Sequence, residues 1–131
     1  MANYEVKINS LSIIAFRFIK QLHVFLWEMV FDIHIFVCTN QRTGTDRLSC
    51  GEAHGLDLVT EFKKQTKDLK TDLKIRAQRA GCLGICDFGP TVVIYPEGIF
   101  YVNVKKEDVT EIIQSLIVNK KLVERLVLKK Q

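Results

Sequence analysis

The spacing of apolar residues predicts helices in three parts of the chain. Leucine, isoleucine, valine and phenylalanine recur there at three- and four-residue steps, which is the spacing of an amphipathic helix. The three parts are residues 11–26, 52–70 and 107–118. In the second part, lysines occupy the side opposite the apolar face, as on a helix that packs one face on a core. We therefore expect two helices after residue 28 and an apolar helical stretch before it.

Four shorter segments have the pattern of strands. One of them, 73–78, alternates apolar and polar residues and is expected to bury one side only. The other three are runs rich in β-branched and aromatic residues, at 33–37, 91–95 and 99–104. The residues YPEG at 95–98 predict a turn that joins the last two strands into a hairpin. The order β-α-β-β-β-α predicts an α/β (α+β) fold, in which helices flank a small mixed sheet.

Residues 1–28 are expected to form an N-terminal extension to a domain that spans residues 29–131. Their apolar residues lie on more than one side of the predicted helix. They either form a helix, or they are not part of the native protein, in which case Met29 is the start. We expect no membrane insertion, because Arg17 and Lys20 interrupt a stretch that would need about 20 apolar residues to span a bilayer.

Length and charge exclude some classes of function. The chain has 131 residues, of which 47% are apolar, and this suits one domain with a modest core. Its 19 basic and 15 acidic residues give a net charge of +4, and they are spread evenly along the sequence. No basic stripe with interleaved aromatic residues is present, so we expect no binding to nucleic acid.

The four cysteines are the candidate chemistry of the chain. No secretory signal is recognisable, so we expect a cytoplasmic protein whose reduced thiols bind metal rather than pair as disulfides. Cys38 follows the first predicted strand, Cys50 precedes the helix at 52–70, and Cys82 and Cys86 share a glycine-rich loop. These places can all lie at one end of the sheet. At the start of the helix, the partial positive charge of unpaired amides is expected to favour the Cys50 thiolate.

The spacing of the cysteines favours an iron–sulfur cluster over zinc but leaves both open. Four thiolates can hold either group. Zinc sites usually take their ligands in closely spaced pairs such as C-x2-C, which this chain lacks. The loop around the last two cysteines contains three glycines, which are expected to let backbone amides reach the sulfurs of a cluster. These glycines are Gly81, Gly84 and Gly89.

Four stretches of the sequence resemble the thioredoxin-like [2Fe-2S] ferredoxins. They are HIFVCTNQR at 34–42, SCG at 49–51, GCLGIC at 81–86 and GPTVVIYPEG at 89–98. The resemblance implies a thioredoxin-like fold and a [2Fe-2S] cluster. It also implies four ligands to the irons, namely Cys38, Cys50, Cys82 and Cys86. The small cluster subunit of respiratory complex I is less similar, because its first two cysteines lie closer together.

The resemblance also implies a function. We expect a one-electron carrier, not an enzyme, which exchanges electrons with redox partner proteins. Family members often pair as homodimers, and unpaired strand edges favour association, so we expect a homodimer. Two alternatives remain open. One is a module in which the cluster senses redox state or controls a protein contact, and the other is a structural zinc domain.

Overall fold

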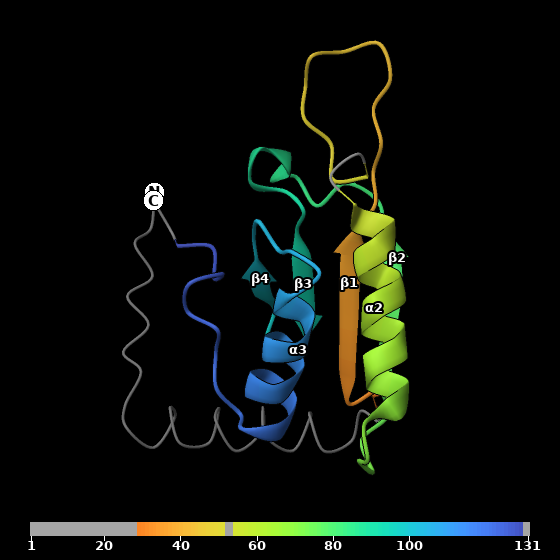
Figure 1. The fold of residues 1–131 in the computed structure, drawn as a ribbon, viewed down its shortest axis with the longest axis vertical. Helices are drawn as coiled ribbons and strands as arrows, with labels where there is room; N and C mark the ends of the chain where they lie inside the picture. Colours follow the sequence, from red (N-terminus) through yellow and green to blue (C-terminus); the bar gives the residue numbers. More distant parts are fainter. Residues whose placement is uncertain (1–28, 52–53, 130–131) are drawn as a thin grey trace, which may run out of the picture. The chain divides into compact units, whose positions relative to one another are not determined.

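The central feature of the fold is a four-stranded mixed sheet with the strand order β2-β1-β3-β4 (Figure 1). The computed structural model describes residues 29–51 and 54–129. β1 runs parallel to β2 and antiparallel to β3, and β3 runs antiparallel to β4. The strands are β1 (Ile33–Cys38), β2 (Ile75–Ala80), β3 (Val92–Tyr95) and β4 (Ile99–Tyr101). The predicted small mixed sheet is therefore confirmed.

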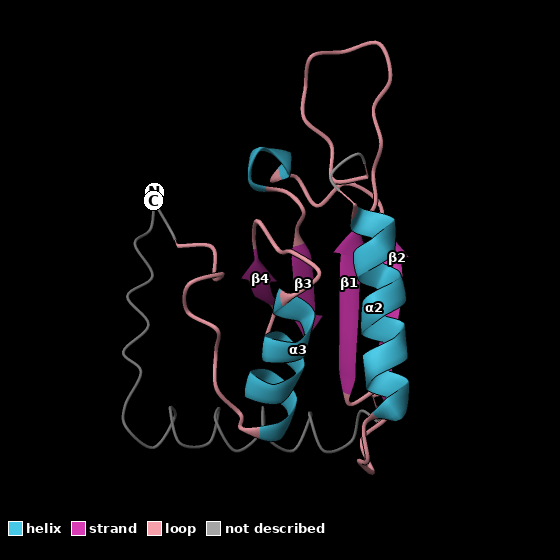
Figure 2. Ribbon diagram, viewed as in Figure 1, coloured by secondary structure: helices cyan, strands magenta, loops and turns pink. Residues whose placement is uncertain are grey.

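Two helices flank this sheet (Figure 2). The crossover helix α2 (Gly55–Asp68) connects β1 to β2. The closing helix begins as α3 (Asp108–Ile112), continues as a π-helix over Ile113–Val118, and ends at Asn119. A short 3₁₀ helix, η1 (Cys86–Phe88), lies in the loop before β3. The element order agrees with the predicted β-α-β-β-β-α order, which confirms the α/β (α+β) class.

The predicted position of β2 was wrong by two residues. The sequence indicated 73–78, whereas the strand spans Ile75–Ala80. The shift follows from a local clamp between the chain ahead of β1 and the chain ahead of β2. The Lys74 backbone N–H donates to Asp32 Oδ2 at 2.7 Å, and the Asp32 N–H donates to the Lys74 carbonyl at 2.9 Å. Regular pairing between the two strands begins only after this clamp, at Ile33 and Ile75.

The last strand is shorter than predicted. β4 was expected over 99–104 but ends at Tyr101. Beyond this point the chain turns to other partners, because the Val102 N–H donates to the Leu126 carbonyl at 2.8 Å. The Asn103 N–H donates to the Phe88 carbonyl at 2.7 Å. This second bond ties the end of the hairpin to the loop that contains Cys82 and Cys86.

One hydrophobic core joins both helices to the same face of the sheet. Alternate residues of each strand point into it, as period-two alternation requires. Each fully buried aliphatic or aromatic side chain contributes roughly 1.5–3 kcal/mol through removal of its surface from water. The core includes Ile33, Ile35 and Val37 of β1, Leu58, Val59 and Phe62 of α2, Val92 and Ile94 of β3, and Val109 and Ile112 of α3.

The other face of the sheet carries a row of aromatic rings. His34 stacks on Phe36 with ring centroids 4.0 Å apart, and Phe31 meets His34 edge-on at 5.0 Å. Phe36 in turn meets Tyr95 of β3 edge-on at 6.0 Å. Edge-to-face and stacked pairs at these separations are favourable beyond the area they bury. The row thus runs across the paired strands β1 and β3 on this face.

The C-terminal segment covers the outer edge of β4. The sequence pattern of 120–131 predicted no element. In the structure, Val127 forms an antiparallel bridge with Tyr101, and the Leu128 N–H donates to the Phe100 carbonyl at 2.9 Å. Arg125 holds the segment to α3 through ion pairs with Asp108 and Glu111. An edge covered in this way is no longer open to pairing with another strand.

The N-terminal extension at residues 1–28, with its predicted helix, lies outside the described residues, and so does the question whether the native chain starts at Met29. Within residues 29–51 and 54–129, no helix is long and apolar enough to cross a membrane.

We predict that truncation of Phe62 strongly destabilises the folded chain. This side chain is 0% exposed and lies between α2 and the sheet. We expect Phe62→Ala to lower the free energy of unfolding by about 3–5 kcal/mol, because a cavity replaces a fully buried ring. Urea unfolding followed by circular dichroism measures the change. Lys64→Ala on the exposed side of the same helix is the control and should change stability by less than about 0.5 kcal/mol. Equal effects of the two substitutions would contradict the packing described here.

Candidate metal centre

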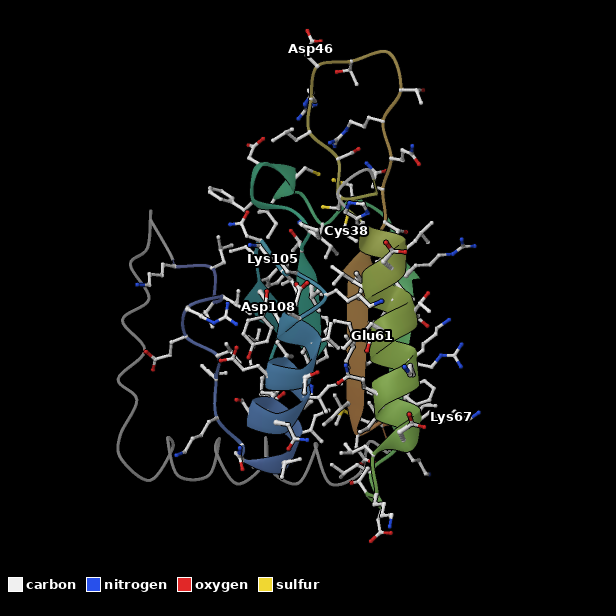
Figure 3. The ribbon with its side chains drawn as sticks, viewed as in Figure 1. Cys38, Asp46, Glu61, Lys67, Lys105 and Asp108 are labelled. Atoms are coloured by element: carbon white, nitrogen blue, oxygen red, sulfur yellow. The ribbon has the colours of Figure 1, made fainter. Side chains whose placement is uncertain are left out.

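The four cysteines lie at one end of the sheet, where three segments of the chain meet. Cys38 is the last residue of β1, and its N–H donates to the Thr91 carbonyl at 3.0 Å. The next residue, Thr39, donates to the carbonyl of Ala80, the last residue of β2. Figure 3 labels Cys38 at this end of β1, below the loop that carries Asp46. The expectation that the cysteines share one end of the sheet is confirmed.

Cys38 and Cys50 form a buried inner pair. Cys38 is 0% exposed and Cys50 is 1% exposed. Burial raises the pKa of the Cys50 thiol to about 11, and the neighbouring Cys38 thiol adds to this shift. The Thr91 backbone N–H acts in the opposite direction, because it donates to the Cys50 sulfur.

The expectation that a helix N-terminus favours the Cys50 thiolate was wrong. Helix α2 begins at Gly55, so a turn separates Cys50 from the first helical residue. The Gly55 N–H is occupied by the Cys50 carbonyl at 2.9 Å and does not face the sulfur. Loss of hydration on burial is therefore the main cause of the raised pKa of Cys50. Gly55 itself packs against the carbonyls of Cys38 and Cys50, which leaves no space for a Cβ.

Cys82 and Cys86 form an outer pair. Cys82 is exposed, Cys86 is half-buried, and their Sγ atoms are 3.2 Å apart. The pKa of the Cys82 thiol is lowered, first by the hydrogen bond from Cys86 and then by the Gly84 N–H, which donates to Cys82 Sγ at 3.3 Å. Arg42 also donates to Cys82 Sγ, at 3.5 Å. The outer pair thus lies at the surface among donors that favour thiolates.

The three loop glycines differ in their contacts, and the expectation that their amides reach the sulfurs of a cluster stays a prediction. Gly84, at φ +83°, directs its amide to the Cys82 sulfur. Gly89 instead provides space, since a Cβ there would lie 2.6 Å from Cys50 Sγ. The Gly89 N–H donates to the Cys86 carbonyl at 3.1 Å. Among the described residues, Gly81 makes no hydrogen bond to a sulfur and has open space around it.

The arrangement of donors fits a group with two metal ions better than a single ion. Inner and outer pairs are adjacent, because Gly89 packs against Cys50 Sγ and donates its N–H to the Cys86 carbonyl. In the part of the chain that the structure describes, however, no three His, Cys, Asp or Glu side chains surround one point. In a Cys₄ [2Fe-2S] centre each iron takes two thiolates, which corresponds to two pairs of cysteines.

Two buried hydroxyls add to this fit. Ser49 Oγ and Thr91 Oγ1 have no hydrogen-bond partner among the described residues, although both residues are at least 95% buried. Ser49 precedes Cys50 in sequence, and the Thr91 amide contacts the Cys50 sulfur. Buried polar groups without partners are costly and call for an acceptor. The sulfurs of a cluster held by the adjacent cysteines would supply one.

Arg42 is the residue that sequence reasoning missed. It lies in the long loop between Cys38 and Cys50, and the sequence offered only a weak signal, since this loop holds two basic residues, Arg42 and Arg47, between two candidate ligands. Its contact with Cys82 spans 40 residues of sequence. His54 lies close to Cys50 in sequence, just before α2. Its side chain is exposed and pairs with Asp57 at 3.4 Å.

Comparisons with known proteins agree on one family. A model of the family described as thioredoxin-like [2Fe-2S] ferredoxin matches residues 16–117. The chain is 39% identical over 94 residues to a protein named "Ferredoxin, 2Fe-2S" from Clostridium pasteurianum, which covers 71% of this chain and 92% of that protein. It is 34% identical over 99 residues to a protein of the same name from Aquifex aeolicus, covering 74% of this chain and 89% of that protein.

Solved structures give the same result. The wild-type thioredoxin-like [2Fe-2S] ferredoxin from Aquifex aeolicus superimposes with a TM-score of 0.70 at 33% identity, over 75% of this chain and 97% of that one. A cysteine-to-serine variant of the same protein superimposes with a TM-score of 0.69, also at 33% identity, over 75% of this chain and 99% of that one. The thioredoxin-like fold is therefore confirmed.

The two pairs predict unequal reactivity of the cysteines in the folded, cluster-free chain. We expect iodoacetamide at pH 8 to modify Cys82 first and Cys50 far more slowly. The thiolate is the nucleophile, so the raised pKa of Cys50 and its burial both reduce its rate. Raising the pH toward 11 should speed the modification of Cys50 more than that of Cys82. Peptide mass spectrometry measures each site, and the chain in urea is the control in which the rates converge. Equal rates in the folded chain would contradict the described burial.

Proposed function

The chain belongs to the thioredoxin-like [2Fe-2S] ferredoxin family, and from this premise we propose that Cys38, Cys50, Cys82 and Cys86 are its cluster ligands. As a member of this family it is an electron carrier with a [2Fe-2S] cluster. The observation that carries the proposal is the position of the four thiols at one end of the sheet. Cys82 Sγ and Cys86 Sγ are 3.2 Å apart, and Gly89 packs against Cys50 Sγ while its N–H donates to the Cys86 carbonyl. The cluster supplies the chemistry, which is the uptake and release of one electron.

Two of the proposed ligands are buried and hold the cluster in place, and the other two lie toward solvent and expose it. We assign one iron to Cys38 and Cys50, which burial shields from water and from exchange of ligands. We assign the other iron to Cys82 and Cys86, which lie toward solvent. Gly84 and Thr91 direct backbone N–H groups at ligand sulfurs. Such donors stabilise negative charge on sulfur and so tune the reduction potential.

The surface beside the outer pair is the proposed docking site for redox partner proteins. Leu48 is 62% exposed, and its carbonyl accepts from the same Arg42 that contacts Cys82. Phe88 follows Cys86 in η1 and is 40% exposed. Apolar side chains around an exposed redox centre let a partner approach closely and exclude water. We further propose that the chain carries electrons without catalysing a reaction of its own.

The state of the thiols supports a proposed location. All four cysteines are free, and none is paired in a disulfide. Thiolate ligands must be reduced before they bind a cluster. We propose that the protein acts in the cytoplasm, where thiols are kept reduced.

The ligand assignment predicts the metal content and its loss in variants. Anaerobically purified chain should be red-brown and should contain two irons and two sulfides, counts that follow from the cluster formula. Its potential should lie far below that of a Rieske centre, at about −400 mV, because four thiolates place more negative charge on the irons than a Cys₂His₂ set. Cys50→Ala and Cys82→Ala should each bind less iron, and their clusters should be lost faster. Thr43→Ala, in the exposed loop after Cys38, is the control and should keep the full iron content.

Two outcomes separate this proposal from its alternatives. One zinc and no iron per chain after iron-replete anaerobic expression would contradict the cluster and favour a structural zinc domain. An intact cluster in Cys82→Ala would contradict the ligand assignment alone. A partner that binds only the cluster-free chain would favour a sensing module over a carrier.

We also propose that the chain forms a homodimer through the aromatic face of the sheet. Within the described residues, β2 is the strand edge without a partner, but it exposes Arg76 and Arg79, and charges on an edge strand oppose pairing. The aromatic row ends at Tyr95, which is 45% exposed and adjoins Phe36. Aromatic residues are enriched in the cores of protein interfaces.

The dimer proposal predicts the effect of one surface charge. Sedimentation of the cluster-loaded chain at micromolar concentration should give twice the mass of 15.1 kDa. We expect Tyr95→Lys to shift the equilibrium to monomer, because it places a charge in the interface. Leu56→Lys removes a side chain of similar exposure, 54%, on α2 and should leave the dimer intact. A wild-type chain that sediments only as monomer would overturn the dimer, and a dimer insensitive to Tyr95→Lys would overturn the proposed face.

A further inference from the structure

Arg42 joins two loops of the site through the two ends of one guanidinium group. Its Nη1 donates to the Leu48 carbonyl at 2.7 Å, and its Nη2 donates to Cys82 Sγ at 3.5 Å. The first contact closes the loop between Cys38 and Cys50 on itself. The second connects this loop to the loop of the outer pair, 40 residues further along the chain. A planar guanidinium can make both contacts at once, because its donors point in fixed, divergent directions.

The charge of Arg42 is directed at the outer pair. Its contact with the sulfur is a charge-assisted hydrogen bond to a group that becomes anionic as a ligand. Among the described residues, the ion pairs involve His54, Lys106 and Arg125, and none links Arg42 to a carboxylate. After the hydrogen bonds from Cys86 and Gly84, the Arg42 guanidinium also lowers the pKa of the Cys82 thiol, which is consistent with this proximity.

We propose that Arg42 is a positioning residue that braces the outer pair and raises the reduction potential of the cluster. This inference rests on the ligand assignment proposed above. Reduction adds one electron to the cluster and thus one negative charge. A fixed positive charge beside Cys82 stabilises the reduced state more than the oxidised state, so the potential rises. Because a guanidinium stays protonated throughout the physiological range, this contribution does not depend on pH.

Three substitutions distinguish the effect of the Arg42 charge from the effect of its two bridging hydrogen bonds. Arg42→Gln removes the charge, and Arg42→Lys keeps the charge but lacks the rigid fork. Arg47→Gln is the matched control, since Arg47 lies in the same loop, is exposed, and its described hydrogen bond runs from its backbone N–H to Thr45 Oγ1. Each full-length, cluster-loaded variant is titrated anaerobically to find its midpoint potential. The half-life of the visible cluster absorbance and the iron content are measured in parallel.

We expect Arg42→Gln to lower the midpoint potential. At the wild-type midpoint, its ratio of reduced to oxidised protein should fall about three- to tenfold. A tenfold fall corresponds to about 59 mV for one electron. The difference from wild type should shrink at high salt, because the site is exposed and its electrostatics are screened. Arg42→Lys should keep a midpoint near wild type but lose its cluster faster than wild type. Arg47→Gln should match wild type in both measurements.

Two results would overturn this role for Arg42. One is a midpoint potential for Arg42→Gln equal to that of Arg47→Gln. The other is an equal shift in Arg42→Lys and Arg42→Gln, since that would exclude charge as the cause. Failure of the ligand assignment is distinguishable from both results, because the wild-type chain itself would then lack two irons or keep its cluster in Cys82→Ala.

Discussion

The parallel pairing of β1 with β2 is the interaction on which the candidate site depends. Parallel strands end at the same edge of a sheet, so the segments that follow them start next to each other. Cys38 ends one strand and Ala80 ends the other, and the Thr39 N–H closes the gap between them at the Ala80 carbonyl. The antiparallel partner β3 starts at the same edge, where the Thr91 carbonyl accepts from Cys38. Three distant segments therefore meet without a long excursion of the chain.

The depth of the two cysteine pairs links this geometry to electron transfer. Cys38 is part of the sheet, and Cys50 is sealed beneath Gly89, a position where any side chain would collide with its sulfur. Cys82 lies at the surface. An electron carrier needs both conditions, because burial keeps ligands from being replaced by water and exposure brings the redox centre within reach of a partner. Under the proposed assignment, the fold meets both conditions by taking two ligands from buried cysteines and two from a surface loop.

The loops contribute more to the outer pair than the regular elements do. Gly84 and Arg42 both donate to Cys82, one from the same loop and one from the loop after β1. The Asn103 N–H bonds to the Phe88 carbonyl, which anchors the far end of the cysteine loop to the β3–β4 hairpin. The Aquifex aeolicus ferredoxin, at 33% identity, shares the overall fold.

The sequence by itself determined the order of the elements and the candidate donors. Apolar spacing reports which side of a segment is buried, so 33–37 and 107–118 were recognisable as a strand and a helix. The tertiary structure alone decided where α2 begins, how the environment shifts the pKa of Cys50, and that Arg42 reaches Cys82. The reason is physical. The packing of Gly55, the burial of Cys50 and the contact of Arg42 all depend on groups from other parts of the chain, and local spacing carries no information about those groups until the strands have paired.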